Sequence, residues 1–174
     1  MKNIVLKFGF LSGGLMALLL VLTFVLLRGP WLFEYGAPVG YVGMVLAFSV
    51  VFIGVKSYRD TVHQGNISFG KALQVGLLIA VVSSLCYVVT WLVVHGFFFP
   101  DFMDQYATHA VDKLRRSGAT EAAIQKTAEE MNQFKGYYAN PFFRAAVTFV
   151  EPLPVGIVVS LLTALILKRK PANQ

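Results

Sequence analysis

A single acidic residue, Glu151, lies in a stretch of the sequence that is otherwise uncharged and mostly apolar, TFVEPLPVGIVVS. Pro152 and Pro154 follow it, and each proline removes a backbone N–H donor from a helix that contains it. An ionisable group inside an apolar segment of this kind is a candidate for relaying a proton or a cation across a membrane. We therefore name Glu151, Pro152 and Pro154 as the candidate functional or kink site.

The same residues could instead serve only the structure. If the helix starts at the beginning of its apolar segment, Glu151 lies about 9 Å inside the helix end, where a charge costs roughly 2.5–3.5 kcal/mol on insertion scales. Protonation would lower this cost, as would pairing with Tyr87, Ser83 or Ser84, or a helix that begins at the glutamate with the prolines in its first turn. We expect a mixed arrangement in which a helix descends to the glutamate, the prolines kink it and the carboxyl group accepts hydrogen bonds. Both interpretations of Glu151, as a structural anchor and as a relay, stay open.

No other residues form a motif for catalysis or metal binding. The chain has one cysteine, Cys86, and it lacks a nucleotide-binding loop, a zinc signature and a nucleophile elbow. His109 lies near Asp104 and Asp112 in the sequence, but the paired spacing typical of a metal site is missing. We expect a protein that is not an enzyme, with no catalytic residues, no bound metal and no cofactor.

Four long apolar segments would have to position the glutamate. Of the 174 residues, 56% are hydrophobic and 14% are charged, against about 25% charged residues in soluble domains. The apolar segments are long enough to cross a hydrocarbon core of roughly 30 Å as helices, and they cover residues 8–27, 37–55, 72–94 and 145–167. The runs are continuous, which favours helices over the alternating strands of a barrel. We predict an all-α integral membrane protein in which residues 1–174 form a single four-helix membrane domain.

The segment between the third and fourth spans, about residues 101–135, is predicted to form an extracytoplasmic hairpin of two amphipathic helices. Each helix has one face marked by residues at three- and four-residue steps, which are Met103, Tyr106, Ala107, Ala110, Val111 and Leu114 in the first helix and Ile124, Thr127, Met131 and Phe134 in the second. Gly118 would end the first helix, Thr120 would cap the second, and Gly136 would stop it. These faces either pack on each other and on the membrane ends, or they dock a partner protein.

Small residues recur at four-residue spacing in the second and third spans, where they would let helix backbones approach closely in lipid. The residues that we assign to helix packing are Gly40, Gly43, Ala47, Gly76, Ala80 and Ser84. They predict a compact four-helix bundle. A row of small residues that the bundle leaves unused would also permit a homo-oligomer.

The distribution of charge predicts the orientation of the chain in the membrane. If the N-terminus is cytoplasmic, the inner segments contain one acid, Asp60, and the basic residues Lys2, Lys7, Lys56, Arg59, Lys71, Lys168, Arg169 and Lys170. The outer segments contain equal numbers of basic and acidic residues. This is the positive-inside pattern, so we predict that both termini are cytoplasmic. The net charge of +6 follows from this topology, and no clustered basic patch predicts binding to nucleic acid.

Several segments of the chain resemble domain-of-unknown-function family 4199, a family of small four-span bacterial membrane proteins. These segments are KFGFLSGGLM, GYVGMVLAFSVVFIGVKSYRD, GNISFGKALQVGLLIAVVSSLCYVVTW and EPLPVGIVVSLLTALILKRK. The most distinctive parts are the loop before the third span and the EPLPVG sequence of the last span. The resemblance implies a multi-pass protein of the bacterial inner membrane. It implies nothing about a substrate, and it provides no catalytic residues to carry over to this chain.

These observations together favour an accessory or assembly subunit that acts through helix packing and through its outer hairpin. Its surroundings would be the lipid bilayer, with a membrane or periplasmic protein as a possible partner or further copies of the chain in a homo-oligomer. The alternative is a small oligomeric transporter, or a proton- or cation-coupled channel, that uses Glu151 inside the membrane.

Overall fold

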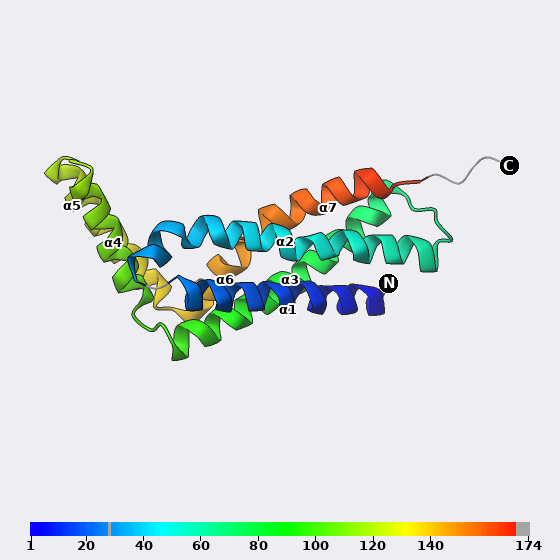
Figure 1. Cartoon of the computed structure of the whole chain (residues 1–174), viewed down its shortest axis with the longest axis horizontal. Coiled ribbons are helices and arrows are strands. Elements are labelled where there is room, and N and C mark those ends of the chain that lie inside the picture. The colour runs from blue at the N-terminus through cyan, green and yellow to red at the C-terminus, as the bar shows by residue number, and fades with distance from the viewer. Residues whose placement is uncertain (28, 170–174) are drawn as a thin grey trace.

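The computed structural model describes residues 1–27 and 29–169, which fold into seven helices (Figure 1). The helices are α1 (Lys2–Leu26), α2 (Pro30–Val62), α3 (Phe69–Phe97), α4 (Phe102–Arg116), α5 (Glu121–Tyr138), α6 (Pro141–Val150) and α7 (Leu153–Leu167). Four helical segments are long and apolar enough to cross a membrane: α1, α2, α3, and α6 together with α7. The described part of the chain contains no strand. The predicted all-α architecture with four candidate membrane spans is therefore confirmed.

The spans are longer than the apolar segments predicted, and α2 differs most. It begins at Pro30 rather than at residue 37, because the fixed φ of proline suits the first turn of a helix. It continues past residue 55 to Val62, and the chain then reverses through Gln64 and Gly65, which have φ values of 50° and 89°. An apolar window marks the part of a helix that suits lipid, whereas the helix itself continues until a turn or cap ends it.

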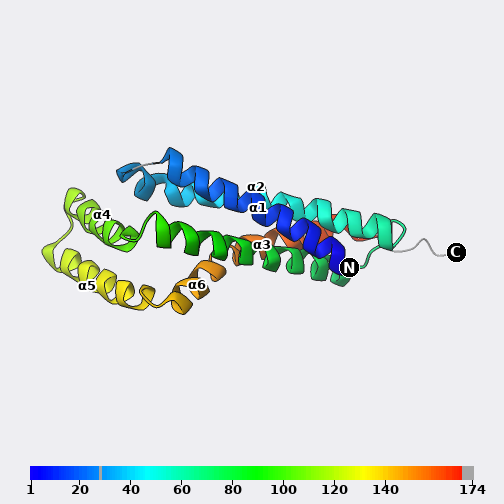
Figure 2. The same cartoon turned by 90° about the horizontal axis from the view of Figure 1, so that it is seen from below.

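Helices α1, α2, α3 and α7 pack side by side as a bundle (Figures 1 and 2). Its core contains large side chains that are fully buried, including Phe48, Val51 and Ile79. In lipid such packing stabilises the bundle through close contact rather than through removal of apolar surface from water. The bundle therefore depends on positions where two helix backbones can approach.

Two predicted packing residues of α3 lie where α3 meets α7. A Cβ atom added at Gly76 would lie 3.0 Å from the side chain of Ser160 in α7, and one added at Gly156 would lie 2.9 Å from Ala80. Neither site has room for a larger side chain unless the helices separate. Ser84 is fully buried and donates a hydrogen bond to the Ala80 carbonyl within α3.

The predicted packing residues of α2 are divided between two environments. Ala47 is fully buried, and its carbonyl oxygen accepts a hydrogen bond of 2.8 Å from the Ser12 hydroxyl of α1. A Cβ atom added at Gly43 would lie 3.5 Å from Leu19 of α1, which is ordinary contact. One added at Gly40 would meet nothing within 4 Å. Gly40 thus borders open space rather than a neighbouring helix.

Helices α4 and α5 pack against each other and project beyond the end of the bundle (Figure 1). Gly118, with φ of 74°, ends α4, and the Thr120 side chain accepts a hydrogen bond from the backbone N–H of Ala123 to cap α5. An ion pair between Lys135 and Asp104 joins the two helices near their bases. The predicted end and cap are both confirmed.

The expected stop of α5 at Gly136 is wrong, because the helix continues to Tyr138. A glycine within a helix costs only about 0.5–1 kcal/mol relative to alanine, which neighbouring contacts can offset. The break comes instead where the Asn140 side chain accepts hydrogen bonds from the first N–H groups of α6 and Pro141 occupies its first turn. Helix α6 therefore begins four residues before the predicted fourth span.

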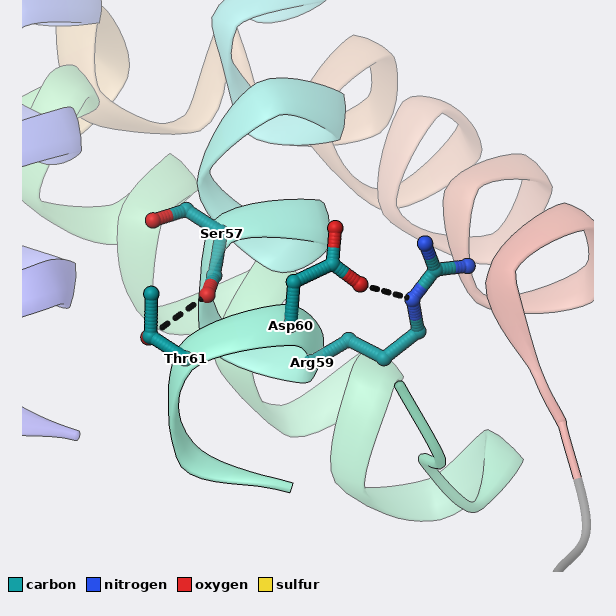
Figure 3. A network of polar contacts seen from close by, with 4 residues as sticks. All are labelled: Ser57, Arg59, Asp60 and Thr61. Carbon is teal, nitrogen blue, oxygen red and sulfur yellow. Dashed lines mark hydrogen bonds and ion pairs between the residues drawn. The ribbon is translucent and has the colours of Figure 1, made fainter. Parts of the chain in front are cut away.

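At the other end of the bundle, α1 begins and α7 ends beside the loop between α2 and α3 (Figure 1). Ile67 of that loop and Arg169 after α7 form an antiparallel bridge, with N–O distances of 3.1 and 2.9 Å. Nearby, Arg59 and Asp60 form an ion pair of 2.7 Å, and the Thr61 hydroxyl donates to the Ser57 carbonyl (Figure 3). The polar side chains near the end of α2 thus bond to one another or to the backbone of the last turns of that helix.

Candidate functional site: an apolar cavity beside Glu151

The fourth span is broken at Glu151 and Pro152, between α6 and α7. Pro154 is the second residue of α7, a position where a helix needs no backbone donor. Pro152 is fully buried, and its carbonyl accepts the first helical bond of α7 from Gly156. Glu151 lies ten residues after the start of α6, which is about 15 Å along the helix. The glutamate is thus deeper than the 9 Å expected, because the helix begins earlier.

The Glu151 carboxyl group has a hydrogen-bond partner on α3. The Tyr87 hydroxyl donates to Glu151 Oε2 over 3.2 Å, and this is the one hydrogen bond of that side chain in the described part of the chain. Tyr87 lies ten residues before the end of α3, so the two groups are at matching distances from the same end of the bundle. Ser83 and Ser84, the other expected partners, bond to backbone carbonyls of α1 and α3 instead.

A cavity of about 380 Å³ adjoins Glu151 and is lined by α1, α2, α3, α4, α5 and α6. Its volume falls within the range of roughly 300–1,000 Å³ found for small-molecule sites. Most of its lining is apolar, with Met16, Leu20 and Phe24 of α1 among the side chains. Glu151 lines the cavity and is exposed despite its position along the span. The cavity therefore gives this carboxyl group access to a space that a ligand can occupy.

Two features of the chain create this space. The middle of the wall formed by α2 consists of small residues, which are Gly36, Ala37, Gly40 and Gly43. In addition, α7 packs on α2 and α3, whereas α6 packs on α3 and α5. The break at Glu151 therefore directs α6 away from α2, and Figure 1 shows the chain changing direction there. The space between the small wall and the diverted helix is the cavity.

A second polar cluster lies between α3, α5 and α6. The Trp91 indole N–H donates to the Tyr138 hydroxyl over 2.6 Å, and both residues line the cavity. Burial raises the pKa of Tyr138 above its usual range, so the phenol stays neutral at physiological pH. Arg144 lies over the Tyr138 ring and 2.8 Å from His95 Nδ1. These bases belong to the surrounding structure and do not line the cavity.

The helices α4 and α5 cover the cavity at the end where they leave the bundle. Phe102 and Tyr106 of α4 and Phe134 of α5 line it. Their rings form part of a larger aromatic cluster, in which Trp91 and Phe102 have centroids 5.0 Å apart. Part of the face that the sequence predicted for hairpin packing thus covers the cavity.

Sequence reasoning named Glu151 and its prolines but missed the cavity and the residues opposite. The small residues of α2 could have indicated the cavity, because small residues at four-residue spacing are found either where two helices pack closely or where a helix borders a cavity. Trp91 and Tyr138 gave no signal, because their contact joins residues far apart in the sequence. The site therefore combines one local feature with several long-range ones.

A comparison with known protein families covers nearly all of the chain, including the cavity. The family model described as "Protein of unknown function (DUF4199)" matches residues 7–169. That range includes Glu151, Tyr87 and every residue found to line the cavity. No curated protein and no solved structure gives a significant match. The chain therefore belongs to the DUF4199 family of proteins of unknown function.

Proposed function

We propose that this protein is a non-enzymatic membrane protein that binds a small lipophilic molecule in the cavity beside Glu151. The observation that carries the proposal is the cavity itself, which joins a largely apolar lining to one carboxyl group at membrane depth. Ligand sites in proteins have this composition, with a few polar groups that fix the orientation of a mostly apolar ligand. An ionisable group at that depth also costs free energy, which is a reason to expect it to have a function.

The same proposal includes an orientation in the bacterial inner membrane. Both termini would be cytoplasmic, and the hairpin of α4 and α5 would be extracytoplasmic. The distribution of charge supports this, because the end of the bundle where α1 begins and α7 ends carries the basic residues Lys2, Lys7, Lys56, Arg59, Lys71, Lys168 and Arg169. The hairpin would then cover the cavity from the periplasmic side.

Native mass spectrometry of the protein, extracted gently from its own membranes, tests the binding function. Gly40 lines the cavity, and a Cβ atom added there would meet nothing within 4 Å. Gly40→Leu would therefore place a side chain in the cavity. Gly14→Leu is the matched control, since Gly14 also has nothing within 4 Å and lies outside the cavity lining. We expect a bound small molecule on the wild-type protein and on the control, and its loss from Gly40→Leu. Equal retention by all three proteins would contradict the proposal.

The same measurement addresses the second candidate, an accessory or assembly subunit. The projection of α4 and α5 beyond the bundle supports it, because most side chains of these helices are exposed. A stoichiometric second protein in the extracted complex would favour this role. A homo-oligomer with bound ions or lipid would favour the transport alternative, in which Glu151 acts within the membrane. Neither result removes the cavity, so ligand binding and assembly can coexist.

A further inference from the structure

The charge balance of the cavity indicates what kind of ligand it would hold. Among the described residues that line it, Glu151 is the only acid, and there is no lysine, arginine or histidine. The carboxylate has one hydrogen bond in the described part of the chain, from Tyr87, and its Oε1 atom has none. A carboxyl group in an apolar site needs either a counter-charge for its ionised form or a proton that makes it neutral. The site thus lacks one positive charge.

The cavity is also rich in aromatic rings. Eight of its lining residues are aromatic, and they come from α1, α2, α3, α4 and α5. Phe24, Trp91 and Phe102 form a continuous group, with ring centroids 5.0 to 6.1 Å apart. The face of an aromatic ring attracts a cation, and such rings are the usual walls of sites for quaternary ammonium groups. Aromatic walls with one carboxylate make a site that fits an organic cation.

Other ligand classes fit this lining less well. An anion would meet Glu151 and find no base in the lining, because the nearby bases Arg144 and His95 bond to each other outside it. A neutral lipid would fill the apolar space but would bring no counter-charge, so Glu151 would have to stay protonated. A lipophilic cation satisfies both the apolar walls and the charge.

We propose, on the basis of the ligand-binding function above, that the cavity binds a lipophilic organic cation, such as a quaternary ammonium ion or a protonated amine, with Glu151 as its counter-ion. Binding to the protonated carboxyl group releases one proton to water and leaves a carboxylate paired with the cation. Protons and cations therefore compete for one group. The other titratable groups in the lining are the phenols of Tyr87 on α3, Tyr106 on α4 and Tyr138 on α5, while α1 and α2 contribute none.

A pair of probes with the same shape separates charge from size. Phenyltrimethylammonium is the cation, and tert-butylbenzene is its neutral counterpart, with carbon in place of nitrogen. The chain has two tryptophans, so Trp31→Phe leaves Trp91, in the cavity wall, as the sole tryptophan, which is excited selectively over tyrosine at long wavelength. Binding is then measured in nanodiscs by Trp91 fluorescence, for both probes, at pH 6 and pH 8.

We expect both probes to change Trp91 fluorescence, and the affinity for the cation to rise with pH while that for the neutral probe stays constant. Glu151→Gln should lower the affinity for the cation by about tenfold or more, and it should change the affinity for the neutral probe by no more than a few-fold. Gly40→Leu should lower the affinity for both probes, whereas Gly14→Leu should change neither affinity. If Glu151→Gln does not fold, the comparison of the two probes across pH on the wild-type glutamate decides alone.

The outcomes separate this proposal from the one on which it rests. Binding of tert-butylbenzene without pH-dependent binding of the cation would overturn the cation site and leave the ligand-binding function standing. Equal effects of Glu151→Gln on both probes would also overturn it. Failure of both probes to bind the wild-type cavity would overturn both proposals.

Discussion

At the scale of single residues, the central contact is the hydrogen bond from Tyr87 to Glu151. It joins two spans at matching distances from one end of the bundle, and it satisfies one oxygen of the carboxyl group. Hydrogen bonds to charged groups contribute more than neutral ones, about 1.5–3 kcal/mol against about 1 kcal/mol. The phenol therefore both holds α6 to α3 and limits the cost of the acid.

Tyr87→Phe should lower the free energy of unfolding by about 1–2 kcal/mol, because it removes this donor and leaves the carboxyl group without a hydrogen bond. Thermal unfolding of the purified protein in a mild detergent, followed by circular dichroism, measures the change. Tyr41→Phe is the control, since Tyr41 is exposed and makes no hydrogen bond in the described part of the chain. Equal stability of the two variants would show that the contact contributes nothing.

The choice of Tyr87 over the two serines shows how far the sequence could lead. All three lie on α3 and were equally plausible partners for Glu151 by depth. A serine inside a helix bonds readily to the carbonyl four residues earlier, and both Ser83 and Ser84 do so. A tyrosine hydroxyl is too far from its own backbone for such a bond, so it stays available. This physical reason was accessible from the sequence, whereas the direction of α6 was not.

At the scale of helices, the break between α6 and α7 decides the shape of the site. The two prolines predicted its place, because proline removes donors and restricts the residue before it. They carry no information about which way α6 turns. That direction depends on the packing of α6 against α5 and against α3, and α3 is far from α6 in the sequence. Long-range packing of this kind explains why the break could be predicted and the cavity could not.

Two adjacent glycines of α1 give a matched test of helix packing. A Cβ atom added at Gly13 would lie 2.6 Å from the Cβ of Cys86 in α3, whereas one added at Gly14 would meet nothing within 4 Å. Gly13→Ala should destabilise the protein by about 1–3 kcal/mol through overpacking. Gly14→Ala should be neutral or slightly stabilising, since alanine favours helix. Thermal unfolding compares the two directly, and a similar loss in both would mean that α1 and α3 are less closely packed than described.

At the scale of the whole molecule, the proposed orientation in the membrane rests on the distribution of charge and can be tested with reporters. We expect green fluorescent protein fused after the C-terminus to fluoresce, as it does when it folds in the cytoplasm. Alkaline phosphatase inserted at Gly118, in the turn between α4 and α5, should be active, since it requires the periplasm. The reverse pattern of activities would invert the topology, and it would place the basic end of the bundle outside, against the positive-inside bias.

The bridge between Ile67 and Arg169 has a consequence for the order in which the molecule is completed. It connects the turn after the second span to the segment that follows the fourth span, and it closes a loop of about 100 residues. Helices α1, α2 and α3 can enter the membrane and meet during synthesis. The partner of Ile67, however, is absent until the fourth span has been made. The turn between the second and third spans therefore reaches its final pairing only after the fourth span has been made.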